Sequence, residues 1–144
     1  MKHTNRLNQY PRSSELAAQV PLVDIQRCLV MLTASAFDAA DLDVSSIHRE
    51  LSEWRQSGTT TSAFLAKVIS MSERHEMEGF MHTRRGEPEL RIVSFKRARA
   101  LGALAYALDA PQDPLGALRD TAYEAIAAML TDSGVMATLQ DFVE

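Results

Sequence analysis

The sequence predicts a mainly α-helical fold that contains one small two-stranded β-hairpin. Apolar residues recur at three- and four-residue spacing over most of the chain, as is typical of helices with one buried face. The spacing changes only between residues 80 and 95, where two β-prone runs flank a segment with the composition of a turn. The 144 residues fit a single domain, because two domains would have only about 70 residues each, near the limit for an independent core.

Three helices are expected before the hairpin. The first covers residues 22–40, and the second follows Asp43, which can cap it, and ends near Gly58. The third is expected over residues 60–77, with Gly79 just beyond its end. All three carry apolar residues on one stripe, so each is expected to bury one face.

The hairpin and a fourth helix are expected next. Residues 80–83 and 90–95 are the two β-prone runs, and residues 84–89 form the turn between them. Ser94 can cap a helix that follows over residues 95–108. A two-stranded hairpin is marginal alone, so it must pack on the neighbouring helices.

Basic charge gathers on the predicted hairpin, although the net charge of the chain is −4. Residues 80–100 contain six basic and two acidic side chains, whereas residues 100–144 contain one basic and seven acidic side chains. A mildly acidic protein can still attract phosphate locally, because charges beyond about 8 Å are screened. We therefore interpret two clusters of cations as functional: Arg84 and Arg85, and Lys96, Arg97 and Arg99.

The order of these elements is that of a winged helix-turn-helix. Residues 60–77 would be the recognition helix, which reads base edges in the major groove, and the hairpin would be the wing, which contacts phosphates or the minor groove. The order therefore predicts binding to double-stranded DNA. The expected DNA-binding residues are Thr60, Thr61, Ser62, Lys67, Ser70, Arg74, Arg84, Arg85 and Arg91.

Two stretches also carry a resemblance to a known family. SERHEMEGFM (residues 72–81) resembles the end of the recognition helix of MarR-type winged-helix transcriptional regulators, and residues 84–101 resemble their wing and the helix that follows. The resemblance covers residues 44–108. It implies a sequence-specific DNA-binding regulator, a homodimer formed by terminal helices and a palindromic operator. It also implies frequent control by a small-molecule effector or by cysteine oxidation.

The segments outside this core are expected to support a dimer. Residues 22–108 would form the DNA-binding core, and residues 1–21 and 109–144 would supply a mobile N-terminal arm and helices for dimerisation. Two terminal helices, 115–130 and 135–143, are rich in Ala, Leu and Met and nearly free of basic charge. Such stripes are often covered by a second subunit. The alternative is that both helices fold back onto the core of their own chain.

A second hypothesis assigns the function to the acidic C-terminal third. In it the chain is a winged-helix protein-interaction module, an adaptor or an inhibitor, that binds a basic partner or imitates nucleic acid. The net charge of −4 favours this hypothesis. Its working residues would be Asp113, Asp120 and Glu124.

The remaining observations concern chemistry that the sequence does not predict. No catalytic motif, metal-ligand spacing or cofactor motif is present, so we expect neither an enzyme nor a bound metal or cofactor. The only cysteine, Cys28, is interpreted as a small buried hydrophobe rather than a redox sensor, and Trp54 as a core residue. No membrane span or signal sequence is predicted, so a cytoplasmic protein is expected.

Overall fold

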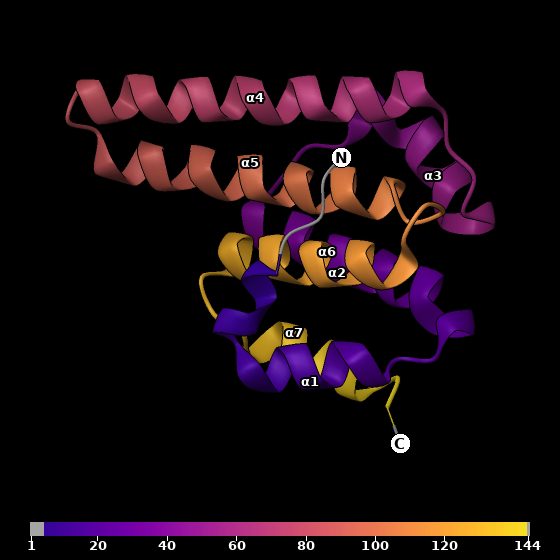
Figure 1. The fold of residues 1–144 in the computed structure, drawn as a ribbon. Helices are drawn as coiled ribbons and strands as arrows, with labels where there is room; N and C mark the ends of the chain where they lie inside the picture. Colours follow the sequence, from indigo (N-terminus) through magenta and orange to yellow (C-terminus); the bar gives the residue numbers. More distant parts are fainter. Residues whose placement is uncertain (1–4, 144) are drawn as a thin grey trace.

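In the computed structural model, which describes residues 5–143, a long helical hairpin lies across a smaller group of helices (Figure 1). The hairpin consists of α4 and α5, and the group below it contains α6 and α2, with α1 and α7 farthest from the hairpin. Three short 3-10 turns complete the described elements. The helices are α1 (Pro11–Gln19), α2 (Ile25–Ala40), α3 (His48–Ser57), α4 (Ser62–Arg84), α5 (Pro88–Leu108), α6 (Pro114–Met129) and α7 (Ser133–Gln140), and the turns are η1 (Arg6–Gln9), η2 (Leu22–Asp24) and η3 (Ser45–Ile47).

The predicted β-hairpin is wrong, and with it the winged helix-turn-helix architecture. Residues 5–143 contain no strand. Residues 80–83 continue α4, and residues 90–95 belong to the first turns of α5. The two helices are joined by a tight turn at Gly86, whose φ of 68° lies in the left-handed region that glycine adopts readily.

The reason for this error lies in the residues that join α4 to α5. The contact is made by small and polar side chains: Ser72 Oγ donates to the Ala98 carbonyl at 2.9 Å, and a Cβ atom added to Gly79 would lie 3.7 Å from Ser94 Cβ. Small residues allow two helices to approach closely, but they carry no hydrophobic periodicity. The bulky residues that suggested strands lie on the outer faces of the hairpin instead.

The hydrophobic core lies below the hairpin, between α2, α6 and the C-terminal half of α5. Leu29, Leu104 and Leu118 come from these three helices, and none of them is exposed. Helices α1 and α7 pack on each other and on this group. The apolar stripe of α6 is buried here, as Ala122 and Ile126 show. The terminal helices thus fold back onto the core of their own chain, which was the alternative to a dimer interface.

The other helices agree well with the sequence. The predicted helices over residues 22–40 and 115–130 correspond to η2 with α2 and to α6, and α3 ends where Gly58 adopts a φ of 73°. The expected mobile N-terminal arm is wrong for the part that is described, since Leu7 in η1 is buried. Residues 1–4 lie outside the described residues.

Helices α1 and α2, with η2, meet at a bend of 102° and satisfy the length and apolarity of a membrane span only as a pair, while no described helix does so alone.

Candidate functional site

The half of the hairpin that contains its turn projects beyond the rest of the molecule. This half, residues 73–95, is called the arm below, and the remaining helices with the other half of the hairpin are called the body (Figure 1). Helix α4 packs chiefly on α5, whereas α5 also packs on α2 and α6. Ala100, Ala103 and Leu104 of α5 are fully buried, so these further contacts belong to the body.

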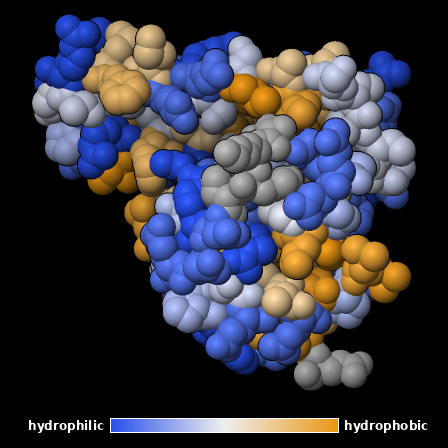
Figure 2. Space-filling view, viewed as in Figure 1, coloured by the Kyte–Doolittle hydropathy of each residue, from blue (hydrophilic) through white to orange (hydrophobic). Residues whose placement is uncertain are grey.

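The arm carries most of the large apolar side chains that are exposed in residues 5–143. Six of these eleven exposed residues lie in the arm, and Met77 and Phe80 are each 65% exposed. Figure 2 shows hydrophobic surface among charged residues at the upper left, where the arm lies. The six are Met77, Phe80, Met81, Leu90, Ile92 and Val93.

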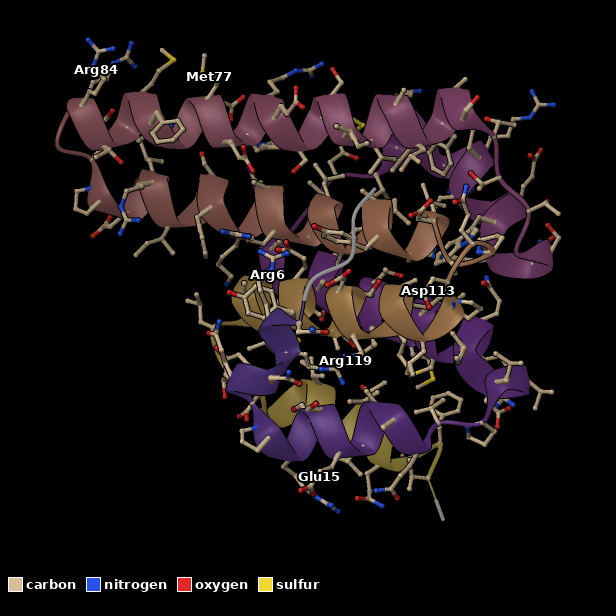
Figure 3. The ribbon with its side chains drawn as sticks, viewed as in Figure 1. Arg6, Glu15, Met77, Arg84, Asp113 and Arg119 are labelled. Carbon is tan, nitrogen blue, oxygen red and sulfur yellow. The ribbon has the colours of Figure 1, made fainter. Side chains whose placement is uncertain are left out.

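These residues lie on opposite sides of the arm. Met77 stands on the edge of α4 that faces away from α5, as does Arg84 (Figure 3). On α5, Val93 precedes Ala100 by seven residues and Leu104 by eleven, so all three lie on one helix face. That face is buried at Ala100 and Leu104 but 39% exposed at Val93. An apolar face that the body covers thus continues into the arm without a cover.

Among the described residues, the side chains of the arginines near the turn lack hydrogen-bond partners like those of Arg97 in the body. Arg84, Arg85 and Arg91 are exposed, and no described carboxylate lies within ion-pair distance of them. In the body, Arg97 donates to the carbonyls of Ala40 and Asp41, at 3.3 and 3.2 Å, where α2 ends.

Glu124 of α6 forms an ion pair with Arg99, the second arginine of the predicted cluster. Arg99 Nη1 lies 3.0 Å from Glu124 Oε2, and Arg6 Nη2 lies 3.1 Å from Glu124 Oε1. Two members of the predicted functional cluster of Lys96, Arg97 and Arg99 thus contact other helices of the body: Arg97 contacts the end of α2, and Arg99 contacts α6.

The predicted DNA-binding residues of the first half of α4 do not form one cationic patch. Thr61 caps the helix by accepting from the Phe64 amide at 3.1 Å, and Lys67 Nζ donates to the Ser46 carbonyl at 3.0 Å. Thr60 is half-buried. The others are exposed: Thr61, Ser62, Lys67, Ser70 and Arg74.

The structure brings together only the residues around the turn of the hairpin. Arg84 and Arg85 lie at the end of α4, and Arg91 lies one turn into α5. Thr61 is separated from Arg84 by the whole of α4, whose 23 residues span about 34 Å at 1.5 Å per residue. The candidate site is therefore the arm, not the predicted combination of recognition helix and wing.

A shallow groove of about 350 Å³ runs along one side of the arm. Phe80 and Thr83 contribute to it from α4, and Arg91 and Phe95 from α5. Arg99 lies over the Phe95 ring, 5.2 Å from its centroid. The groove thus combines aromatic walls with cations at its rim.

The structure does not place the three carboxylates of the second hypothesis on one surface. Asp113 caps α6 by accepting from the Gly116 amide at 3.0 Å. Asp120 is buried, and Glu124 is held by Arg6 and Arg99. Of the three carboxylates, Asp120 and Glu124 are buried in the body, and Asp113 stays exposed at the start of α6.

The interpretations of Cys28 and Trp54 as buried residues are confirmed. Neither is more than 1% exposed. Desolvation by burial, with a smaller contribution from Asp24, raises the pKa of the Cys28 thiol to about 12. A reactive cysteine needs an accessible thiolate, so Cys28 has none of the properties of a redox sensor. Within residues 5–143, no group of three His, Cys, Asp or Glu residues could hold a metal ion.

Comparison with known proteins gives no relative: no family model, no curated protein and no solved structure matches the chain. The site therefore has to be interpreted from its own residues. Sequence reasoning missed five of the six apolar residues of the arm because it assigned residues 80–83 and 90–95 to strands, and it placed Met77 at the end of a helix. A signal for them exists in α4, where Ala66, Ser70, Glu73, Met77, Phe80 and Arg84 alternate in steps of four and three residues.

Proposed function

We propose that this chain is a protein-interaction module whose arm binds another protein chain. The observation that carries the proposal is the concentration of exposed Met77, Phe80, Met81, Leu90, Ile92 and Val93 on the one part of the hairpin that the body does not cover. Large apolar side chains that gather on one exposed segment are unfavourable in water, and exposed apolar patches often mark sites of association.

The composition of the arm favours a protein partner. Protein interfaces are enriched in aromatic residues, Met and Arg, and Phe80, Met77 and Arg84 are of these types. Methionine also adapts to irregular partner surfaces, because its side chain is unbranched and polarisable. Exposed acidic residues, Glu73 and Glu76, interrupt the apolar surface, so insertion of this face into lipid would require their desolvation.

Site-specific photo-crosslinking in the cells that produce the protein tests this proposal. A photoreactive phenylalanine analogue at position 80 is expected to form adducts with a protein. The same analogue at Val23, which is 86% exposed but lies outside the arm, is the matched control and is expected to form none. Equal adduct formation at the two positions, or none at position 80, would contradict the proposal.

Double-stranded DNA is the second candidate, because Arg84, Arg85 and Arg91 are exposed close to the turn and no described carboxylate pairs with them. If these cations contact phosphates, Arg85→Ala weakens binding to all DNA sequences about equally and lowers the salt slope by roughly one. A gel-shift and salt titration on the promoter of its own gene measures both quantities. Absence of binding at low salt removes this candidate.

A further inference from the structure

We propose that the arm binds a second copy of this chain, and that the outer faces of two α4 helices pair in antiparallel orientation. This inference rests on the proposed function, since it names the partner of the same surface. It differs from the dimer expected from the sequence, because the terminal helices bury their apolar faces within the body of their own chain.

The outer face of α4 has the spacing of a helix that pairs with another helix. Its residues follow steps of four and three, which is the heptad pattern of core positions in paired helices. All of them are exposed, whereas Val68, Ser72, His75 and Gly79 on the opposite face are buried or half-buried against α5. Helix α4 thus has one face that is covered and one that is not. The outer residues are Ala66, Ser70, Glu73, Met77, Phe80 and Arg84.

The charges on this face are complementary to a reversed copy of themselves. Glu73 lies at one end of the apolar pair Met77 and Phe80, and Arg84 lies at the other. In an antiparallel pair, Glu73 of each copy meets Arg84 of the other, and Met77 of each copy meets Phe80 of the other. A parallel pair would instead place Glu73 beside Glu73 and Arg84 beside Arg84. The two-fold symmetry of a homodimer requires such self-complementarity.

The positions beside the paired residues are also compatible with the antiparallel register. Arg74 of one copy comes beside Met81 of the other, and Glu76 comes beside Thr83, so no like charges are opposed. Because Ser70 and Ala66 are exposed as well, the outer face stays open toward the body. The end of a second arm can therefore reach along α4 without meeting another helix of the first copy (Figures 1 and 3).

Charge exchange between Glu73 and Arg84 tests the pairing. Purified wild-type chain is expected to be a dimer by light scattering, whereas Glu73→Arg and Arg84→Glu each place like charges at both ends and weaken the dimer by at least about tenfold. The double variant restores both pairs and is expected to dimerise again. An equimolar mixture of the two single variants also restores both pairs, so it is expected to form a heterodimer.

The controls separate this inference from the proposed function. Circular dichroism of each variant shows that it is folded, which is expected because both side chains are exposed. A monomeric wild-type chain, or single variants that dimerise as the wild type does, would overturn the inference. If position 80 then crosslinks to a protein other than this chain, the proposed function stands without it. If no adduct forms there at all, the proposed function falls as well.

Discussion

The two halves of α5 show the difference between the body and the arm within one helix. Toward its C-terminal end, Ala100 and Leu104 are fully buried, while toward its N-terminal end Ile92 and Val93 are 40% and 39% exposed. The helix is continuous through both halves, so its local structure does not depend on burial at every turn. Tertiary packing stabilises the body. In the arm, α4 and α5 cover only the faces that they turn toward each other.

The comparison indicates that the fold does not need the outer surface of the arm. In the body, Leu104 is buried and Glu124 is paired with Arg6 and Arg99. Among residues 5–143, no carboxylate pairs with Arg84, Arg85 or Arg91 of the arm, and six large apolar residues of the arm are exposed. Substitutions in the two regions should therefore differ in their effect on the free energy of unfolding, and three measurements can sharpen or break the comparison.

The largest expected effect is in the core of the body. Leu104→Ala is expected to lower the free energy of unfolding by about 3 kcal/mol, because it removes buried methyl groups and leaves a cavity. The matched change in the arm, Ile92→Ala, is expected to cost less than about 1 kcal/mol, since Ile92 is already partly hydrated. Chemical denaturation of the two variants measures both values. Equal losses would show that a second chain buries Ile92 under the conditions of the measurement.

A smaller effect is expected from the ion pairs of Glu124. Glu124→Gln keeps the size of the side chain but removes the charge that Arg6 and Arg99 contact, so it is expected to cost about 2 kcal/mol. The two arginines are about one-third exposed and regain some hydration, which keeps the loss moderate.

Glu53→Gln is the matched control for Glu124→Gln. The Glu53 pair with Arg49, at 3.8 Å, is exposed, so its loss is expected to cost less than about 0.5 kcal/mol. Denaturant titration of the two variants side by side gives the difference. If Glu124→Gln costs no more than Glu53→Gln, the ion pairs of Glu124 do not hold the body together.

The sequence predicts the body better than the arm, and the reason is the type of residue at the helix contacts. In α2 and α6, the contact faces consist of Leu, Ile and Ala at helical spacing, so the pattern marks the helices and their ends. Between α4 and α5, the contact face includes Ser72, Gly79, Ser94 and Ala98. Bulky β-prone residues stand on the outside, and the local preference for strands is overridden by helix pairing.

The candidate site shows the same division. Arg84, Arg85 and Arg91 could be identified as exposed cations from the sequence, because charge clusters are visible without a fold. The sequence could not predict which arginines bond to other parts of the chain. The acceptors of Arg97 and Arg99 lie on α2 and α6, far away in the sequence. The exposure of Phe80 likewise depends on where the body ends beneath the hairpin.

The smallest expected effect is a gain of stability within the arm. Gly79 has ordinary helical φ and room for a methyl group, since an added Cβ would be in normal van der Waals contact with Ser94. Gly79→Ala should therefore stabilise α4 by about 0.5–1 kcal/mol, because alanine loses less backbone freedom on folding. Hydrogen exchange of the arm amides is expected to slow about two- to fivefold. The substitution leaves the side chains on the outer face of α4 unchanged.

Gly86→Ala gives the matched opposite result. It forces a side chain into the left-handed region at a φ of 68°, so the same amides should exchange faster by a similar factor. Faster exchange in both variants would mean that α4 and α5 approach each other more closely than the contact at Ser94 indicates. The arm would then be a tightly packed part of the fold, and the contrast with the body would rest on its outer face alone.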